Sequence, residues 1–201
     1  MTPAKRLFDI LVALILGVIL LIPVAITALL ILIRDGRPVF YISERMKTPT
    51  EGFRLVKFRT MKTVASDSGV SGGDKADRIT KTGHFLRRTR LDEVPQLWNV
   101  LKGDISFVGP RPPLRQYVER FPTVYREVLK SRPGITGLAS VHFHAHEEWL
   151  LARARTTQET DEIYSRACVP RKARLDLIYQ KNRNLCMDAM IMLKTVFKSL
   201  R

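Results

Sequence analysis

The longest uncharged stretch of the chain constrains the fold more than any other feature. Residues 10–33 are 24 consecutive uncharged and mostly aliphatic side chains, interrupted only by Gly17, Pro23 and Thr27. A helix of this length can cross the hydrocarbon core of a bilayer. The run is too long for the apolar part of a cleavable signal peptide and lacks a small-residue cleavage site. We therefore expect residues 1–33 to form a membrane segment and residues 34–201 to form a separate domain.

Two features bear on whether this segment spans the membrane. Basic residues flank both of its ends, Lys5 and Arg6 before it and Arg34 and Arg37 after it, and such residues favour the cytoplasmic side. Pro23 lies near the middle, where it removes one helical hydrogen bond and clashes with the preceding turn, so a sharp bend is expected. A helix-break-helix that enters and leaves the same leaflet satisfies both observations. Hydropathy alone is equally compatible with a kinked single-span anchor.

The remainder of the chain is strongly basic. The whole sequence has 34 Lys and Arg residues against 19 Asp and Glu residues, a formal net charge of +15. Nearly all of this surplus belongs to residues 34–201, and it indicates a polyanionic partner: nucleic acid, an anionic membrane surface or a phosphorylated substrate. Cys168 and Cys186 are widely spaced, which is typical of a reducing compartment.

The segment RRTRLDEVPQLWNVLKGD, residues 87–104, has the clearest chemistry. Pro95 fits a helix only in its first turn, so Asp92 is predicted to cap a short helix that ends near Gly103. Asp92 and Glu93 would then meet the positive end of the helix dipole, next to three arginines, and both are expected to stay ionised at neutral pH. Ionised carboxylates act as nucleophiles and Mg²⁺ ligands, and arginines beside them favour phosphate. An ordinary acidic helix cap is the alternative.

Cationic side chains also occur around this segment. Two short strands are predicted at residues 39–42 and 53–61, and the second delivers Lys57 and Arg59 to one end of a small sheet. Residues Ser66 to Asp77 are rich in Gly, Ser and Asp, which predicts a mobile surface loop able to act as a lid. Three prolines stiffen the backbone around Arg111, which reduces the entropy lost when its guanidinium binds an anion. Arg132 lies in a second, glycine-containing loop.

Most of the C-terminal half is predicted to be helical. An amphipathic helix is expected over residues 117–130 with a restart at Pro122, and a basic helical stretch over residues 149–181. Residues 185–201 have a broad apolar face, which either lies in a membrane interface or packs on the core.

Three histidines alternate in the sequence at His142, His144 and His146, with Glu147 adjacent. On an extended strand they would share one face, so a metal cluster is conceivable. A polar surface strand is the commoner explanation of such a pattern.

Five motifs occur in order along nearly the whole chain. They are KRLFDI at residues 5–10, KFRTM at 57–61, FLRRTRLDEVPQLWNVLKGDISFVGPRP at 85–112, RPGITGLA at 132–139 and RLDLIYQKN at 174–182. In this order they resemble the monotopic phosphoglycosyl transferases, bacterial sugar transferases that begin glycan assembly on a polyprenyl carrier. The resemblance implies a mostly helical α+β fold: a re-entrant helix-break-helix, bent at Pro23, over residues 1–33, and a small cytosolic α/β domain with amphipathic interfacial helices over residues 34–201.

The resemblance also implies a reaction and a set of site residues. A sugar 1-phosphate would pass from a UDP-sugar to undecaprenyl or another polyprenyl phosphate through a covalent aspartyl-phosphosugar intermediate on Asp92. Asp92 and Glu93 would hold Mg²⁺, and Arg87 would complete the catalytic group. The implied substrate-binding residues are Arg59, Arg111, Arg132, Asp176 and Tyr179. The implied location is the bacterial inner membrane, with the catalytic domain facing the cytoplasm.

A different class of function would explain the charge without catalysis. A membrane-tethered basic module could bind nucleic acid or anionic lipid. Nucleic-acid binding predicts aromatic residues interleaved with basic ones on an exposed face, whereas most aromatic residues here lie at core-like spacing. The expected partners are therefore a UDP-sugar, polyprenyl phosphate and inner-membrane lipids, and not nucleic acid. The sequence leaves open which sugar is used and whether a homo-oligomer forms.

Overall fold

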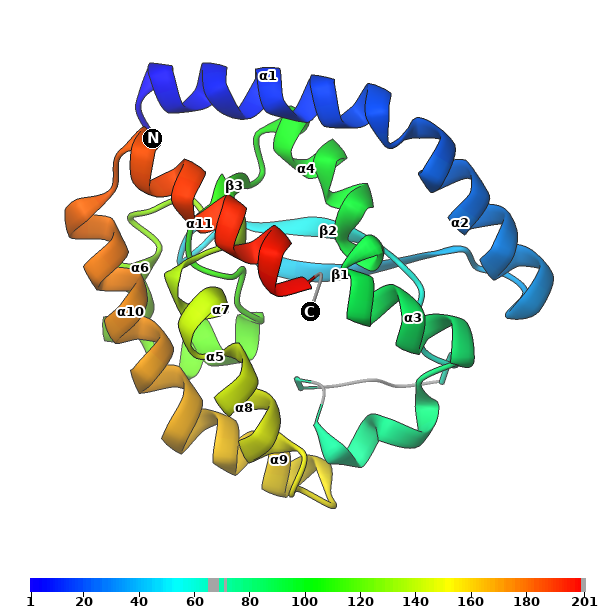
Figure 1. The fold of residues 1–201 in the computed structure, drawn as a ribbon. Helices are drawn as coiled ribbons and strands as arrows, with labels where there is room; N and C mark the ends of the chain where they lie inside the picture. The colour runs from blue at the N-terminus through cyan, green and yellow to red at the C-terminus, as the bar shows by residue number, and fades with distance from the viewer. Residues whose placement is uncertain (65–68, 71, 200–201) are drawn as a thin grey trace.

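Helices surround two small sheets in the computed structural model, which describes residues 1–64, 69–70 and 72–199 (Figure 1). The elements of the N-terminal half are α1 (Pro3–Ile19), α2 (Leu21–Arg34), β1 (Phe40–Met46), β2 (Gly52–Phe58), η1 (Gly73–Arg78), α3 (Lys81–Thr89), η2 (Leu91–Gln96), α4 (Leu97–Lys102) and β3 (Ser106–Val108). They are followed by α5 (Arg115–Arg120), α6 (Pro122–Val128), β4 (Gly134–Thr136), α7 (Leu138–His142), α8 (His144–Leu151), α9 (Thr157–Ile163), η3 (Tyr164–Cys168), α10 (Val169–Asn182) and α11 (Leu185–Ser199). The predicted mostly helical α+β class is confirmed. Residues 66–68 and 71 of the predicted surface loop lie outside the described residues.

The N-terminal apolar run forms two helices, and the chain bends by 62° between them. Figure 1 shows this bend. The break lies at Leu20, and Pro23 occupies the first turn of α2. Proline cannot donate to the carbonyl of Ile19 four residues earlier, which explains why regular hydrogen bonding stops there. The predicted helix-break-helix is confirmed. In the described part of the chain no single helix is long and apolar enough to cross a membrane, and α1 and α2 pass this test of length and composition only as a pair.

Much of the apolar surface of this pair is exposed. A narrow stripe packs inward and includes Ala13 and Ile31. Large exposed side chains cover the other faces of both helices: Leu7, Leu11, Leu14, Ile15, Val18, Ile19, Leu21, Ile22, Ile26, Leu29, Leu32 and Ile33. Exposed apolar area of this extent in a well-packed chain marks a surface that contacts lipid or another protein.

Strands β1 and β2 form an antiparallel hairpin, close to the two strands that the sequence predicts. Tyr41 pairs with Lys57, and Ser43 and Arg45 follow at alternate positions of β1. Directly opposite residues share a face of a hairpin, and so do alternate residues of one strand. These four side chains therefore project from the same face.

Strands β3 and β4 pair in parallel and thereby join the two arginine-bearing loops. The amide of Gly109 donates to the Thr136 carbonyl, and the amide of Gly134 donates to the Pro110 carbonyl, each at 2.9 Å. A Cβ atom on Gly109 would lie 2.1 Å from the Arg132 carbonyl oxygen, so only glycine allows this approach. The pairing fixes the start of the Pro-Arg-Pro-Pro loop that carries Arg111.

The predicted helix cap at Asp92 is wrong. Leu91–Gln96 is the 3-10 helix η2, which contains Pro95, and α4 begins only at Leu97. Arg90, with a φ angle of 60°, ends α3 and directly precedes η2, so Asp92 lies inside the 3-10 helix and does not cap an α-helix. The predicted stop at Gly103 is confirmed, since this residue ends α4 with a φ angle of 88°.

The strand expected for the three histidines is also wrong. His142 ends α7, and His144 and His146 belong to α8, where residues two apart point in different directions. Across the residues that the structure describes, no group of three His, Cys, Asp or Glu side chains is placed to hold a metal ion. The predicted restart at Pro122 is confirmed, because α6 begins there.

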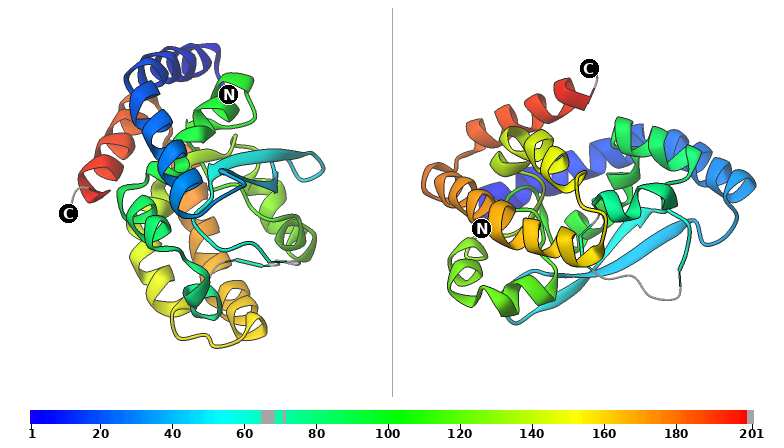
Figure 2. Two further views of the ribbon diagram at one scale, coloured as in Figure 1. Left: turned by 90° about the vertical axis from the view of Figure 1, so that its right-hand side faces the viewer. Right: turned by 90° about the horizontal axis from the view of Figure 1, so that it is seen from below.

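Helix α11 combines the two possibilities that the sequence left open for it. Ile191 is buried with Ala13 and Val100 in a core cluster. Leu193, Val196 and Phe197 on its other side are exposed. In the left panel of Figure 2, α11 (red) and the β1–β2 hairpin (cyan) lie on opposite sides of the molecule.

Candidate active site

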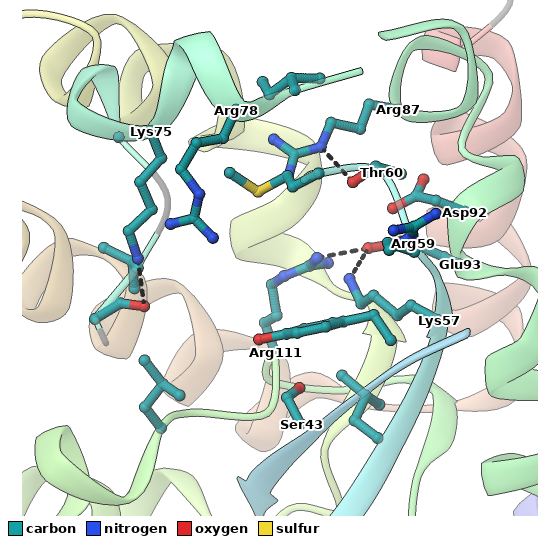
Figure 3. A pocket seen from close by; sticks show the side chains of 18 of the residues that line it. Ser43, Lys57, Arg59, Thr60, Lys75, Arg78, Arg87, Asp92, Glu93 and Arg111 are labelled. Carbon is teal, nitrogen blue, oxygen red and sulfur yellow. Dashed lines mark hydrogen bonds and ion pairs between the residues drawn. The ribbon is translucent and has the colours of Figure 1, made fainter. Parts of the chain in front are cut away.

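A cavity of about 610 Å³ lies above the β1–β2 hairpin. Its walls come from η1, α3, η2, the Arg111 loop and α8 (Figure 3). Several buried polar atoms around it have no hydrogen-bond partner within the described residues: Ser43 Oγ, Arg59 Nε, Asp92 Oδ1 and Gln96 Nε2. Buried polar groups in folded proteins are almost always paired, so this concentration points to a polar ligand.

The acidic pair lies at one end of this cavity, on η2. Asp92 and Glu93 are only 8% and 7% exposed. Glu93 Oε1 accepts hydrogen bonds from Lys57 Nζ at 2.8 Å and from Arg111 Nη2 at 2.5 Å (Figure 3). Its other oxygen lies 3.9 Å from Arg90 Nη1. Glu93 is thus the centre of a buried ion cluster, while Asp92 keeps an oxygen that has no partner among the described residues.

The two carboxyl groups differ in pKa as a result. Burial raises the pKa of Glu93, but the charges of Arg111, Lys57 and Arg90 outweigh it and hold that pKa well below the usual glutamate range. Burial, followed by the charge of Glu93, raises the pKa of Asp92, and the neighbouring cations offset this only in part. The prediction of a readily ionised carboxyl is correct for Glu93. For Asp92 the shift has the opposite sign, because the residue is buried and not exposed at a helix end.

Arg87 and Arg59 also line the cavity. Arg87 Nε donates to Thr60 Oγ1 at 3.0 Å, and its charge is among those that lower the pKa of Asp92 (Figure 3). Arg59 is buried and donates to the carbonyl oxygens of Asp35 and Gly36 at 2.6 and 2.7 Å. Its guanidinium therefore ties the end of α2 to the hairpin beside the site.

Three of the predicted site residues lie away from the carboxylates. Arg132 lies beside the Gly103 turn, next to Arg6, and is not among the residues that line the cavity. Asp176 and Tyr179 are buried on α10 and do not line it either.

Tyr179 has a clear structural role. Its hydroxyl lies 2.6 Å from Asp188 Oδ1 and 3.2 Å from the Val108 carbonyl, and Lys5 donates to the same Asp188 carboxylate at 2.5 Å. These contacts tie α10 to α11, β3 and α1. Asp176 has a buried oxygen without a partner within the described chain, and burial raises its pKa to about 7.

Other residues of the cavity were not predicted as site residues. Lys57 contacts Glu93 directly, and the available sequence signal was the pair of cations, Lys57 and Arg59, at the end of the predicted strand. Lys172 of α10 donates to Glu147 of α8 at 2.8 Å on another wall, and no local motif marks this pair.

A second cavity, of about 450 Å³, adjoins the first. It shares Arg87, Arg90, Glu93 and Arg111 with the cation-lined cavity. Its remaining lining is mainly apolar and comes from the end of α1, from α4 and from α11: Leu16, Leu20, Leu97, Met192 and Val196. Glu93 therefore lines both cavities, whereas Asp92 lines only the polar one, and the apolar cavity reaches the break between α1 and α2.

A buried carboxylate pair among cations, beside an apolar cavity that reaches a bent apolar helix pair, fits an enzyme that acts on phosphates. The chain belongs to the bacterial sugar transferase family, whose model matches residues 1–201. The family resemblance drawn from the five motifs is confirmed. A basic module without catalysis is accordingly not favoured.

Curated relatives give the family more detail. The chain is 36% identical over 200 residues to the UDP-N-acetylgalactosamine-undecaprenyl-phosphate N-acetylgalactosaminephosphotransferase of Aeromonas hydrophila, covering 96% of this chain and 42% of that protein. It is 35% identical over 200 residues to an uncharacterized sugar transferase of Bacillus subtilis (strain 168), covering 98% of this chain and 87% of that protein. It is 32% identical over 198 residues to the UDP-glucose:undecaprenyl-phosphate glucose-1-phosphate transferase of Klebsiella pneumoniae, covering 96% of this chain and 39% of that protein. The chain thus spans less than half the length of two of these relatives.

Proposed function

We propose that this protein transfers a sugar 1-phosphate from a UDP-sugar to undecaprenyl phosphate or a similar polyprenyl phosphate. The observation that carries the proposal is the position of the acidic pair: Asp92 and Glu93 line a cation-lined cavity, and Glu93 also lines the apolar cavity that adjoins it. The first suits a nucleotide diphosphate, and the second suits the isoprenoid chain of a lipid phosphate. Relatives named for UDP-sugars and undecaprenyl phosphate support both assignments.

Asp92 is proposed as the nucleophile in the first half-reaction. One of its carboxylate oxygens attacks the phosphorus that bears the sugar, and an aspartyl-phosphosugar bond forms. The bond from that phosphorus to the UMP oxygen breaks, and its electron pair leaves with UMP. Lys57, Arg111 and Arg87 supply positive charge where the phosphate oxygens gather negative charge.

The lipid phosphate takes the phosphosugar in the second half-reaction. An oxygen of the polyprenyl phosphate attacks the same phosphorus, the bond to Asp92 breaks, and the carboxylate is restored. The product is a polyprenyl diphosphate sugar. Arg87 and Arg90 line both cavities, so they are placed to bind the acceptor phosphate while its tail follows Leu16 and Leu20.

The carboxylates also fit a magnesium ion. Asp92 Oδ1 is buried without a partner in the described chain, and carboxylate oxygens are the hard donors that Mg²⁺ prefers. Asp92 and Glu93 would hold the ion together with substrate phosphate oxygens and water. Bound there, it would neutralise charge on the diphosphate.

The exposed apolar faces of α1, α2 and α11 support a membrane location. We propose that the bent pair is re-entrant in the bacterial inner membrane, with the domain of residues 34–201 on the cytoplasmic side. The basic residues at both ends of the apolar run favour this orientation.

The trapped intermediate tests the proposal. Incubation with UDP-sugar and Mg²⁺, without lipid phosphate, should give a phosphosugar adduct in intact-protein mass spectrometry. Asp92→Asn should show no adduct and no turnover, while its melting temperature stays at or above that of the parent protein. Parent-like turnover in a folded Asp92→Asn variant would sink the covalent mechanism. Turnover by the parent without any adduct would instead favour direct transfer between the two substrates.

A further inference from the structure

The floor of the polar cavity carries a cation that the reaction above does not use. Arg45 of β1 projects from the hairpin face that carries Lys57, and it lines the cavity. Within the described chain its guanidinium makes no hydrogen bond or ion pair with a carboxylate, although the side chain is half-buried. Burial lowers the pKa of Arg45, and the charge of Arg111 is the second cause. A guanidinium in this position is costly to the protein alone, which suggests that it binds an anion from outside.

The hydroxyl of Ser43, on the same face of β1 as Arg45, also lacks a partner within the described chain. Ser43 is two residues before Arg45 on β1, and its Oγ is buried without a hydrogen-bond partner in the described chain. Figure 3 shows the Ser43 side chain below Arg111, pointing toward the cavity. A hydroxyl can donate to an anion, so Ser43 and Arg45 together offer donors from one strand.

We propose that Arg45 and Ser43 bind the phosphate group that leaves with the nucleotide. This inference rests on the UDP-sugar reaction proposed above. In-line displacement places the leaving phosphate on the side of the reacting phosphorus that is opposite to Asp92. Tyr41 pairs with Lys57, which contacts Glu93. At about 3.4 Å per residue, Arg45 lies roughly 14 Å along β1 from Tyr41. Arg45 is therefore farther than Lys57 from the acidic pair.

The chemistry of the step gives this contact a role in catalysis. When the bond from the sugar phosphate to UMP breaks, the phosphate of UMP gains one negative charge. A phosphate between Arg45 and Arg111 would also relieve the repulsion between these two cations. Because the charge increases as the bond breaks, Arg45 would bind the transition state more tightly than the ground state.

Calorimetric titration with UMP and with uridine tests the proposal. Arg45→Gln should weaken UMP binding about tenfold or more, since it removes a charge-assisted hydrogen bond, and should leave uridine binding unchanged. Ser43→Ala should weaken UMP binding by a smaller factor and should not lower the melting temperature, because its hydroxyl has no partner in the described chain. Arg115→Gln is the matched control: Arg115 lies near the same strand but pairs with the exposed Glu44 at 2.7 Å.

Each other outcome has a definite meaning. Unchanged UMP affinity in both Arg45→Gln and Ser43→Ala overturns the proposal, as does an equal loss for UMP and uridine, which would assign Arg45 to the nucleoside. If the parent transfers sugar phosphate but Arg45→Gln behaves like the parent, the inference fails and the proposed function stands. If the parent neither binds UMP nor forms the phosphosugar adduct, the proposed function fails and this inference with it. If Arg45→Gln does not fold, the Ser43→Ala titration decides.

Discussion

Replacing Glu93 by glutamine should destabilise the protein strongly. Glu93 accepts hydrogen bonds from Lys57 and Arg111 through one oxygen. Glutamine keeps the shape of the side chain but leaves the two cations together without a counter-ion. Burial is the main cause of the lowered pKa of Lys57, and the charge of Arg111 lowers it further, so these two cations repel each other.

The size of the loss follows from burial. The side chains of Lys57 and Glu93 are 17% and 8% exposed, which is the range where removing one partner of an ion pair costs about 3–5 kcal/mol. Arg111 is 36% exposed, and water screens its charge in part. We therefore expect the lower end, about 3 kcal/mol. For a chain of this size that corresponds to a fall of roughly 6–12 °C in melting temperature.

Thermal and urea unfolding followed by far-UV circular dichroism measures this loss. Glu44→Gln is the control, because it breaks an exposed ion pair with Arg115 and should change nothing measurable. Adding Lys57→Met to Glu93→Gln should restore part of the stability, since one unpaired cation is gone. An ordinary surface substitution changes the free energy of unfolding by less than about 0.5 kcal/mol. A loss in that range for Glu93→Gln would refute the claim that Glu93 stabilises a buried ion cluster.

The pH dependence provides an independent check with a definite sign. The pKa of Glu93 is lower in the folded protein than in an unfolded chain, so the folded state favours its ionised form. Its contribution to stability is therefore present above about pH 4.3 and is lost as the pH falls through the folded pKa. The difference between the parent and Glu93→Gln should shrink in acid. A difference that stays constant from neutral to acidic pH would contradict the assignment.

Three further substitutions test other parts of the structure. Asp92→Asn should keep or raise stability at neutral pH, because burial raises the pKa of Asp92 and an ionised form is disfavoured in the fold; unfolding at several pH values measures this. Burial raises the pKa of Asp176 to about 7, so the parent should lose stability relative to Asp176→Asn as the pH rises from about 4 through 7, and a constant difference would contradict this. Gly83→Ala should cost about 2 kcal/mol or more, because its Cβ would lie 2.0 Å from the Thr60 carbonyl oxygen, whereas Gly17→Ala, with nothing within 4 Å, should not destabilise.

Local sequence rules predicted the parts of the fold that depend on neighbouring residues. The bent helix pair follows from an apolar run with Pro23 inside it, and the restart of α6 follows from Pro122. The end of α4 at Gly103 also follows from a local signal, the glycine itself. The alternating histidines show the limit of such rules. His142, His144 and His146 occur at every second position, which suggested a strand. The chain on both sides of His144 is nevertheless helical.

The site itself depends on contacts between distant segments, which no local pattern contains. Lys57 reaches Glu93 from a strand 36 residues earlier, and Arg111 reaches it from a loop 18 residues later. That loop is held in place by the pairing of β3 with β4. The sequence could therefore name the acidic pair and Arg111 as site residues, but it could not tell which carboxylate the cations would contact.

That choice bears on the proposed chemistry. Glu93 is held ionised by Lys57 and Arg111, and a carboxylate engaged by two cations is a weak nucleophile. Asp92 has the raised pKa, and one of its oxygens has no partner within the described chain. A carboxylate with a raised pKa is a more basic nucleophile once it is ionised, and a phosphate neutralised by nearby cations favours its attack. The asymmetry of the pair thus supports Asp92 as the nucleophile and Glu93 as the group that positions Lys57 and Arg111.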